Sequence, residues 1–352
     1  MPARSEPLDR CATERSPLTW AARMLLVAQG FSIAQRLGVP CAVLSACLVP
    51  FTMPAWFPDA LDAESPALFA ALKQAAQDPG ARRVSWTDIE LWMFRLFMSD
   101  IGTDRERLGL EPIPFPEDAS CLPPPPTVMF TFSGSLVERP AHWPAHWHIC
   151  GVWEWLGPEG RVPLPEVLAE FLAEDLERAP VLVTFGSVTR EKRTAADPAH
   201  LAEMVACALR MAGKRAIFHG VHPRGGPWEA IVIASDTFVD YDALLPRCSA
   251  VVHAGGAGLV HACVRAALPQ LIVPFHFDQS SWADRVEWFG IGAQTPRAEV
   301  ITRTNNAMHV ATPLTDALAP EVRARLLQMR ECVVEEGRQG AASAVKLIID
   351  LV

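Results

Sequence analysis

A histidine and three glycines lie within six residues in the segment His253-Ala-Gly-Gly-Ala-Gly258. The apolar run before it predicts a buried strand, and the residues after it predict a helix that begins near Leu259. Unpaired N–H groups in the first turn of a helix attract anions, and glycines let an anion approach them. We therefore expect Gly255, Gly256 and Gly258 to bind a phosphate, with the His253 imidazole as a further donor. The alternative is a tight turn whose glycines serve helix–strand packing, and the residues alone leave both open.

Two other predicted strand ends carry polar residues or glycine. Gly186 and Ser187 follow one apolar run, and Asp278 and Gln279 follow another. In a doubly wound sheet such ends lie side by side at the carboxyl edge. A backbone N–H and a hydroxyl suit a diphosphate, whereas a carboxylate beside an amide suits the hydroxyls of a sugar ring.

The elements that must position these residues alternate along the second half of the chain. Strands are predicted at 181–185, 216–219, 230–234, 249–253 and 271–274, and helices at 198–212, 242–247, 259–267 and 280–289. This alternation predicts an α/β domain with a doubly wound parallel sheet.

The first half is less regular. Helices are predicted at 20–37 and 85–98, strands at 41–45 and 128–132, and a loop at 104–118. Periodicity disappears in the Pro/Trp/His-rich segment 138–160, which we interpret as a hinge between domains. The tail from 320 predicts a helix with a break near Gly337–Gly340.

Composition limits the class of protein. The 352 residues are 50% hydrophobic and carry a net charge of −9 without a basic tract, so nucleic acid is not an expected partner. Nine cysteines without metal-type spacing predict reduced thiols, a cytoplasmic location and no metal site. The uncharged stretch 37–57 is interrupted by three prolines, which favours a strand and a loop over a membrane span.

Three segments resemble one known family. FVDYDALLPRCSAVVHAGGAGLVHACVRAALPQLIVPFHFDQSSWADRVEWFGIG, at 238–292, resembles the donor-site signature of the UDP-dependent glycosyltransferases with two Rossmann-like domains, the GT-B fold. It is most similar to the sterol glucosyltransferases and the macrolide and glycopeptide antibiotic glycosyltransferases. PVLVTFGSV, at 180–188, resembles their Phe-Gly-Ser strand end, and HWPAHWHICGVWEW, at 142–155, the segment that enters their second domain.

The resemblance implies roles by position. The diphosphate of a nucleotide sugar would be bound by His253 and the backbone at Gly255, Gly256 and Gly258, with Gly186 and Ser187 nearby. Asp278 and Gln279 would hold the sugar, and His261 stands where relatives place a polar residue near the nucleotide. Two alternatives remain open: Asp278 as a helix N-cap, and His261 as a packed helix residue.

The sequence also departs from this family. A second histidine, a threonine and a tryptophan are replaced by Ala254, Leu259 and Ala243, which predicts weaker donor binding. Nothing before Phe31 resembles the family's first strand and Gly-rich loop, which carry the catalytic base, so a truncated N-terminal domain is expected and no catalytic residue is assigned. The hinge segment offers three histidines that could substitute for this base, but its Pro/Trp-rich setting argues against them: His142, His146 and His148.

The resemblance also implies a division of the chain. It predicts a partial acceptor-binding domain at 1–148, an interdomain linker at 149–179, a nucleotide-sugar domain at 180–335 and a C-terminal helix at 336–352.

The expected function is inverting transfer of a hexose, glucose above all, from a UDP-sugar to a hydroxyl of a lipophilic acceptor such as a sterol, without cofactor or metal. A membrane surface giving access to the acceptor and a partner chain completing the N-terminal domain are compatible with it. The alternative is a non-catalytic or partner-dependent protein that binds a nucleotide sugar. An epimerase is less supported, because no acidic residues cluster around the sugar-binding segment.

Overall fold

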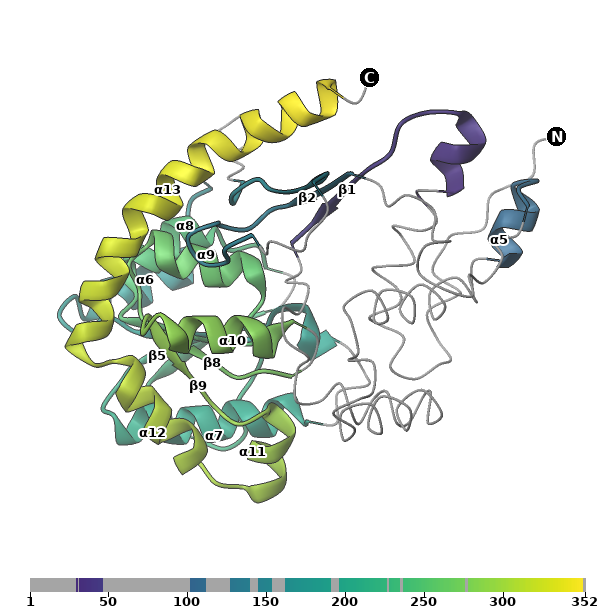
Figure 1. Ribbon diagram of the computed structural model, residues 1–352. Coiled ribbons are helices and arrows are strands. Elements are labelled where there is room, and N and C mark those ends of the chain that lie inside the picture. Colours follow the sequence, from purple (N-terminus) through teal and green to yellow (C-terminus); the bar gives the residue numbers. More distant parts are fainter. Residues whose placement is uncertain are drawn as a thin grey trace, which may run out of the picture. The chain divides into compact units, whose positions relative to one another are not determined.

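The computed structural model describes residues 30, 32–46, 102–111, 127–139, 145–153, 162–190, 196–226, 228–234, 237–275 and 278–350 (Figure 1). The chain divides into two compact units. The first comprises 1–43, 53–127 and 351–352, and the second comprises 44–52 and 128–350. All the candidate site residues lie in the second unit. The predicted helix 85–98 and His142 lie outside the described residues.

In the first unit, residues 32–37 are helical, and a second helix, α5, spans Gly102–Arg107. The buried Arg105 guanidinium joins them by donating to Ser32 Oγ at 3.2 Å and Gln35 Oε1 at 2.9 Å. Its Nε donates to the Glu111 carbonyl at 3.0 Å. The loop predicted at 104–118 therefore begins as a helix, a correction that depends on an arginine binding residues about 70 positions away.

A three-stranded sheet has the order β1-β2-β3, with β1 at Ala42–Ser45, β2 at Thr127–Phe130 and β3 at Trp147–Ile149. Strands β2 and β3 are parallel, with Val128 opposite Trp147. β3 lies in the segment interpreted from sequence as a hinge. Its three residues are half-buried and too few to show a period-2 pattern, and pairing with β2 makes them a strand.

The larger sheet has six parallel strands in the order β6-β5-β4-β7-β8-β9. Their bounds are β4 Val181–Thr184, β5 Ala216–His219, β6 Ala230–Ile233, β7 Ala250–His253, β8 Gln270–Ile272 and β9 Gly292–Gln294. The chain runs outward from β4 to β5 and β6, then returns to place β7 on the other side of β4. The topological switch point, where open α/β sheets bind ligands, therefore lies between β4 and β7. The predicted doubly wound sheet is confirmed.

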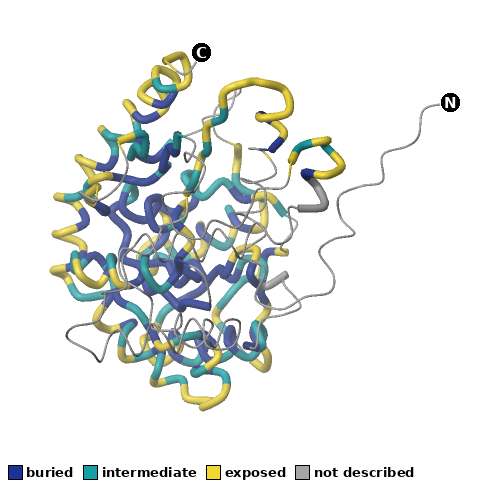
Figure 2. Tube along the Cα trace, turned by 45° about the vertical axis from the view of Figure 1, so that its right-hand side comes forward, coloured by how far each residue is buried: buried dark blue, intermediate teal, exposed yellow. Residues whose placement is uncertain are grey.

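Helices cover both faces of this sheet (Figure 1). One core contains residues of α7 (Pro198–Met211), α11 (Ala298–Thr304) and α12 (Met308–Ala317), and the other contains residues of α6 (Glu166–Glu174), α8 (Tyr241–Leu244) and α9 (Ala257–Arg265). Val181 and Val183 of β4 face the first core and Leu182 the second, as the alternation of a strand requires. Figure 2 shows the buried residues gathered in the interior and the exposed ones toward the outside of the tube.

The segment 149–179, predicted as an interdomain linker, contains α6, whose Leu168 and Leu172 are buried in the second core.

Helix α13 spans Pro320–Ile349 without interruption, so the predicted break is wrong. Gly337 and Gly340 instead let the helix approach another segment: a Cβ at Gly337 would lie 3.1 Å from the Val152 carbonyl oxygen, and one at Gly340 would collide with that of Cys150. Residues 128–130 of β2 and all of β3 belong to the same compact unit as the larger sheet, and the predicted domain boundary near 148 stays a prediction.

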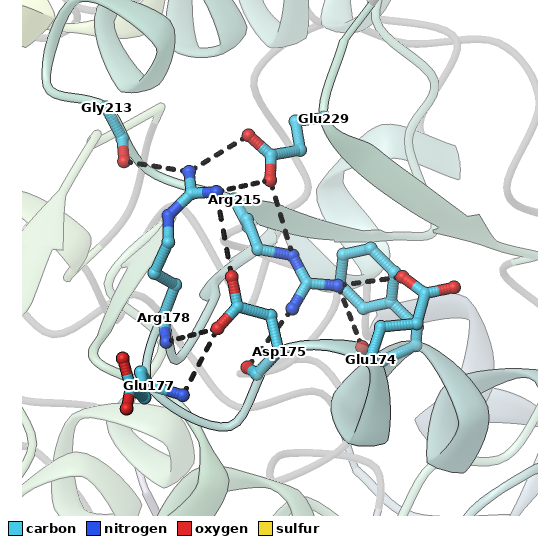
Figure 3. Close-up of polar contacts among 8 residues, drawn as sticks. Glu174, Asp175, Glu177, Arg178, Gly213, Arg215 and Glu229 are labelled. Carbon is cyan, nitrogen blue, oxygen red and sulfur yellow. Dashed lines mark hydrogen bonds and ion pairs between the residues drawn. The ribbon is translucent and has the colours of Figure 1, made fainter.

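The amino ends of the strands carry an ionic network (Figure 3). The buried Arg215 donates to Glu174 Oε2 at 3.0 Å and to the Phe171 carbonyl at 2.8 Å. Arg178 holds both carboxylate oxygens of Glu229, at 2.8 and 3.0 Å. Arg215 and Glu229 directly precede β5 and β6, so the network lies at the edge opposite the predicted site.

Among the residues that the structure describes, no helix is both long and apolar enough to cross a membrane.

Candidate functional site

Two turns meet at the switch point. Strands β4 and β7 pair with Thr184 opposite His253, so the turn at Gly186–Ser187 and the turn at 254–258 leave the sheet side by side. Gly186 and Ser187 are exposed, as are Gly256 and Gly258. The structure thus brings together the two segments that the sequence predicted as a diphosphate site.

The three glycines of the second turn differ in what requires them. Gly255 has φ +93°, and a Cβ there would lie 2.7 Å from Ile272 Cγ2 and 3.1 Å from the Gln279 carbonyl oxygen. The fold therefore requires glycine at 255. Gly256 and Gly258 have no positive φ, and no atom lies within 4 Å of the position their Cβ would take. Neither backbone conformation nor packing explains these two glycines.

Gly256 is the N-cap of α9 and offers no side chain to it. Within the described part of the chain, the N–H groups of Ala257 and Gly258 donate to no protein group. These donors carry the positive end of the helix dipole, at a terminus where two missing side chains leave the backbone accessible. The arrangement can bind an anion.

The imidazole of His253 is buried and both its nitrogens are engaged. Nδ1 accepts the Gly255 N–H at 3.1 Å, and Nε2 lies 3.0 Å from Gln270 Oε1. Nε2 therefore carries the proton, and burial lowers the pKa of His253 to about 4. In this arrangement the ring holds the glycine turn in place, and its expected contact with a diphosphate stays a prediction.

Asp278 and Gln279 are buried at the start of α10 (Gln279–Trp288). Asp278 occupies the N-cap position without capping the backbone, so the N-cap alternative is wrong for its side chain. Its Oδ2 accepts instead the indole N–H of Trp282 at 3.0 Å. Gln279 Oε1 accepts the Phe275 N–H at 2.8 Å, which links the first turn of α10 to a residue just after β8.

His261 lies on α9 and faces Ser133, in the segment between β2 and β3. Its Nδ1 lies 2.6 Å from the Ala257 carbonyl oxygen, and its Nε2 accepts the Ser133 N–H at 3.1 Å. Burial lowers its pKa to about 4, so the ring is neutral at physiological pH. The structure thus supports the packed-residue alternative for His261, and its predicted place near the nucleotide stays a prediction.

Sequence reasoning missed three polar residues beside the first turn. Tyr241 Oη lies 2.7 Å from His219 Nδ1 and 3.2 Å from Thr184 Oγ1, and the same Oγ1 accepts the Gly186 N–H at 3.4 Å. Thr184 and His219 are register partners at the carboxyl ends of β4 and β5. The signal was available, since His219 ends one apolar run, Thr184 is the polar residue inside another, and Tyr241 is the only tyrosine of the chain.

Comparisons with known proteins agree with this geometry. Residues 232–333 match the family described as "Erythromycin biosynthesis protein CIII-like, C-terminal domain". The chain is 33% identical over 259 residues to an O-mycaminosyltylonolide 6-deoxyallosyltransferase of Streptomyces fradiae, covering 74% of this chain and 57% of that protein. It is 29% identical over 332 residues to a sterol 3-beta-glucosyltransferase of Arabidopsis thaliana, covering 89% of this chain and 47% of the relative. The chain thus spans about half the length of these two relatives.

Solved structures show the same fold. The glycotransferase of kitacinnamycin superposes with a TM-score of 0.59 at 17% identity, over 93% of this chain and 74% of that one. The spinosyn rhamnosyltransferase SpnG complexed with thymidine diphosphate superposes with a TM-score of 0.52 at 18% identity, over 86% and 66% of the two chains. These likenesses confirm the predicted fold class.

Proposed function

We propose that this chain, a relative of the antibiotic and sterol glycosyltransferases with the GT-B fold, transfers a hexose from a nucleoside diphosphate sugar to a hydroxyl of a lipophilic acceptor. UDP-glucose is the proposed donor, a sterol the proposed acceptor, inversion the proposed outcome and the cytoplasm the proposed location. One observation carries the donor site: Gly256 and Gly258 are exposed at a helix N-terminus, at the switch point of the sheet, where nothing in the fold requires glycine.

The diphosphate would lie against the N-terminus of α9. Each phosphate oxygen can accept a backbone N–H, and the helix dipole favours its negative charge. The N–H groups of Ala257 and Gly258 are suitable donors, and Gly186 and Ser187 on the neighbouring turn supply a second wall. This binding needs no metal, because backbone donors and the dipole offset the charge.

The sugar would lie toward Asp278 and Gln279. Gln279 lies close to the glycine turn, since a Cβ at Gly255 would lie 3.1 Å from the Gln279 carbonyl oxygen. A carboxylate that binds sugar hydroxyls helps to orient the anomeric carbon, and orientation is a large part of catalysis in group transfer. The acceptor oxygen would then form a bond to that carbon as the bond to the diphosphate breaks. A base must take the hydroxyl proton, and no residue is assigned to that role.

The nucleoside of the donor has a second candidate, thymidine in place of uridine. A spinosyn rhamnosyltransferase with the same fold binds thymidine diphosphate. A thymidine diphosphate sugar would use the same phosphate contacts, so the two donors must be separated by experiment.

Calorimetric titration with UDP, thymidine diphosphate and UDP-glucose, followed by an assay of UDP release in the presence of a sterol, tests the proposal. We expect binding of UDP and UDP-glucose and sterol-dependent release of UDP. Binding without release would instead favour the non-catalytic or partner-dependent alternative. Tighter binding of thymidine diphosphate than of UDP would move the proposal to that donor, and no binding of any of the three would refute the donor site.

The sugar-binding role of Asp278 has its own test. Asp278→Asn should weaken UDP-glucose roughly tenfold and UDP by less than about twofold, the scale of one hydrogen bond to a charged group. The control is Asp284→Asn, an exposed carboxylate on the same helix. Equal losses for UDP and UDP-glucose would refute the role of Asp278.

A further inference from the structure

A buried series of contacts leads from the segment between β2 and β3 to the Asp278 carboxylate. We infer that Trp282 is the positioning residue for Asp278, and that His261, fixed by Ser133, holds Trp282 in place. This inference rests on the proposed function, because it assigns what orients the carboxylate that would hold the sugar of the donor.

The contact between Trp282 and Asp278 fixes the carboxylate. The two residues are four positions apart at the start of α10, so their side chains lie on one face of the helix. The indole N–H donates to Oδ2 at 3.0 Å, and the Trp282 side chain is fully buried. An indole can only donate, so Oδ2 is held as an acceptor and this oxygen of the carboxylate is restrained before a sugar arrives.

Trp282 is itself held by two aromatic rings. His261 lies edge-on at 5.1 Å between ring centroids and Phe132 at 5.7 Å, both favourable geometries for aromatic pairs. The indole therefore cannot turn away from Asp278 without disturbing residues of α9 and of the segment after β2.

The His261 ring cannot turn freely either. Its Nε2 accepts the Ser133 N–H, and its Nδ1 carries the proton donated to the Ala257 carbonyl, so a rotation of the ring would break both hydrogen bonds. Ser133 is anchored in turn, because its hydroxyl donates to Glu336 of α13. Three elements that are distant in sequence thus determine the orientation of one carboxylate.

Trp282→Phe tests the inference, since it keeps a buried ring and removes the single N–H. We expect the affinity for UDP-glucose to fall about five- to tenfold and the affinity for UDP to change by less than about twofold, on the scale of one hydrogen bond to a charged group. The matched control is Trp288→Phe at the exposed end of the same helix, which should change neither. A purely structural role for Trp282 would weaken UDP and UDP-glucose alike, and that result would overturn the inference.

A second readout needs no ligand. In the ¹⁵N spectrum of the full chain, the indole resonance of Trp282, identified by its loss in Trp282→Phe, should shift when Asp278 is replaced in Asp278→Asn, while that of Trp288 should not. An unchanged Trp282 resonance would show that the hydrogen bond is absent and would overturn the inference whatever the titrations give. If the resonance shifts but the wild-type chain binds neither UDP nor UDP-glucose, the proposed function fails, and the role of Trp282 in sugar binding falls with it.

Discussion

Gly255 and Gly258 lie three residues apart, and alanine at the two positions should have opposite effects. At Gly255, a left-handed backbone costs a residue with a Cβ about 1–2 kcal/mol, and the approach of Ile272 adds an overpacking cost of about 1–3 kcal/mol. Gly255→Ala should therefore lower the free energy of unfolding by about 2–5 kcal/mol. At Gly258, inside the first turn of α9, alanine meets no atom within 4 Å and is the better helix former by up to about 1 kcal/mol. Gly258→Ala should leave stability unchanged or raise it.

Although Gly258→Ala should not lower the stability of the chain, it should lower its affinity for UDP. A methyl group at the exposed helix N-terminus would stand where a phosphate must approach the backbone, and loss of one charge-assisted hydrogen bond corresponds to a roughly tenfold or greater fall in UDP affinity. Urea unfolding followed by tryptophan fluorescence measures the first quantity, and calorimetric titration with UDP measures the second. A Gly258→Ala chain that binds UDP as the wild type does would refute the argument that ligand access explains this glycine. An unchanged urea midpoint for Gly255→Ala would refute the close packing against Ile272.

Two further predictions concern stability alone. Burial lowers the pKa values of His253 and His261 from 6.5 to about 4, so between about pH 6.5 and pH 4 the unfolded chain takes up protons that the folded chain does not. Above about pH 6.5 both histidines are neutral in the folded and the unfolded chain, so they cost the fold no stability. As the pH falls through this window, the free energy of unfolding should decrease by roughly 3 kcal/mol for each histidine. An equal free energy of unfolding at pH 7 and pH 5, measured with urea, would contradict this. Arg215→Met should lower the melting temperature clearly, because Glu174 and two backbone carbonyls lose the buried guanidinium that binds them. Arg178→Ala should lower it much less, because Arg178 is half-exposed. Both arginine variants should bind UDP like the wild type, and equal losses of melting temperature would contradict the reasoning.

The parts of the fold that sequence predicted correctly are those where a local pattern decides the structure. The strands at 181–184 and 216–219 and the helix at 198–211 combine apolar runs with glycine or proline at their ends, and a Pro at the start of α7 marks its first turn. The missed elements are specified by distant partners. Strand β9 has the sequence Gly-Ala-Gln, and Gly292 is needed because a Cβ there would collide with the Gln270 carbonyl of β8.

The residues of the candidate site likewise divide into those that a local sequence pattern reveals and those that depend on distant partners. The glycine turn could be located from sequence, because glycine and histidine at a strand end form a local signal. The protonation and partners of His253 could not, since they depend on Gln270, which is 17 residues away and comes within hydrogen-bond reach of the ring only once β7 and β8 are paired. The partner of Asp278 was accessible in principle: Trp282 is four residues on, and a helix brings such side chains together. From the sequence, Asp278 was assigned only an N-cap alternative in this helix, and no prediction was made for Trp282.

Helix α13 has a consequence for how the chain reaches its folded state during synthesis. Ser133 and Glu336 are hydrogen-bonded although they are 203 positions apart, and the two helical glycines fit against Cys150 and Val152. Segments that are synthesised early, including β2 and β3, therefore cannot complete their packing until helix α13, with its 30 residues, has emerged from the ribosome. At about 5–20 residues per second, this leaves their apolar side chains uncovered for roughly ten seconds or more, an interval in which chaperones have time to bind.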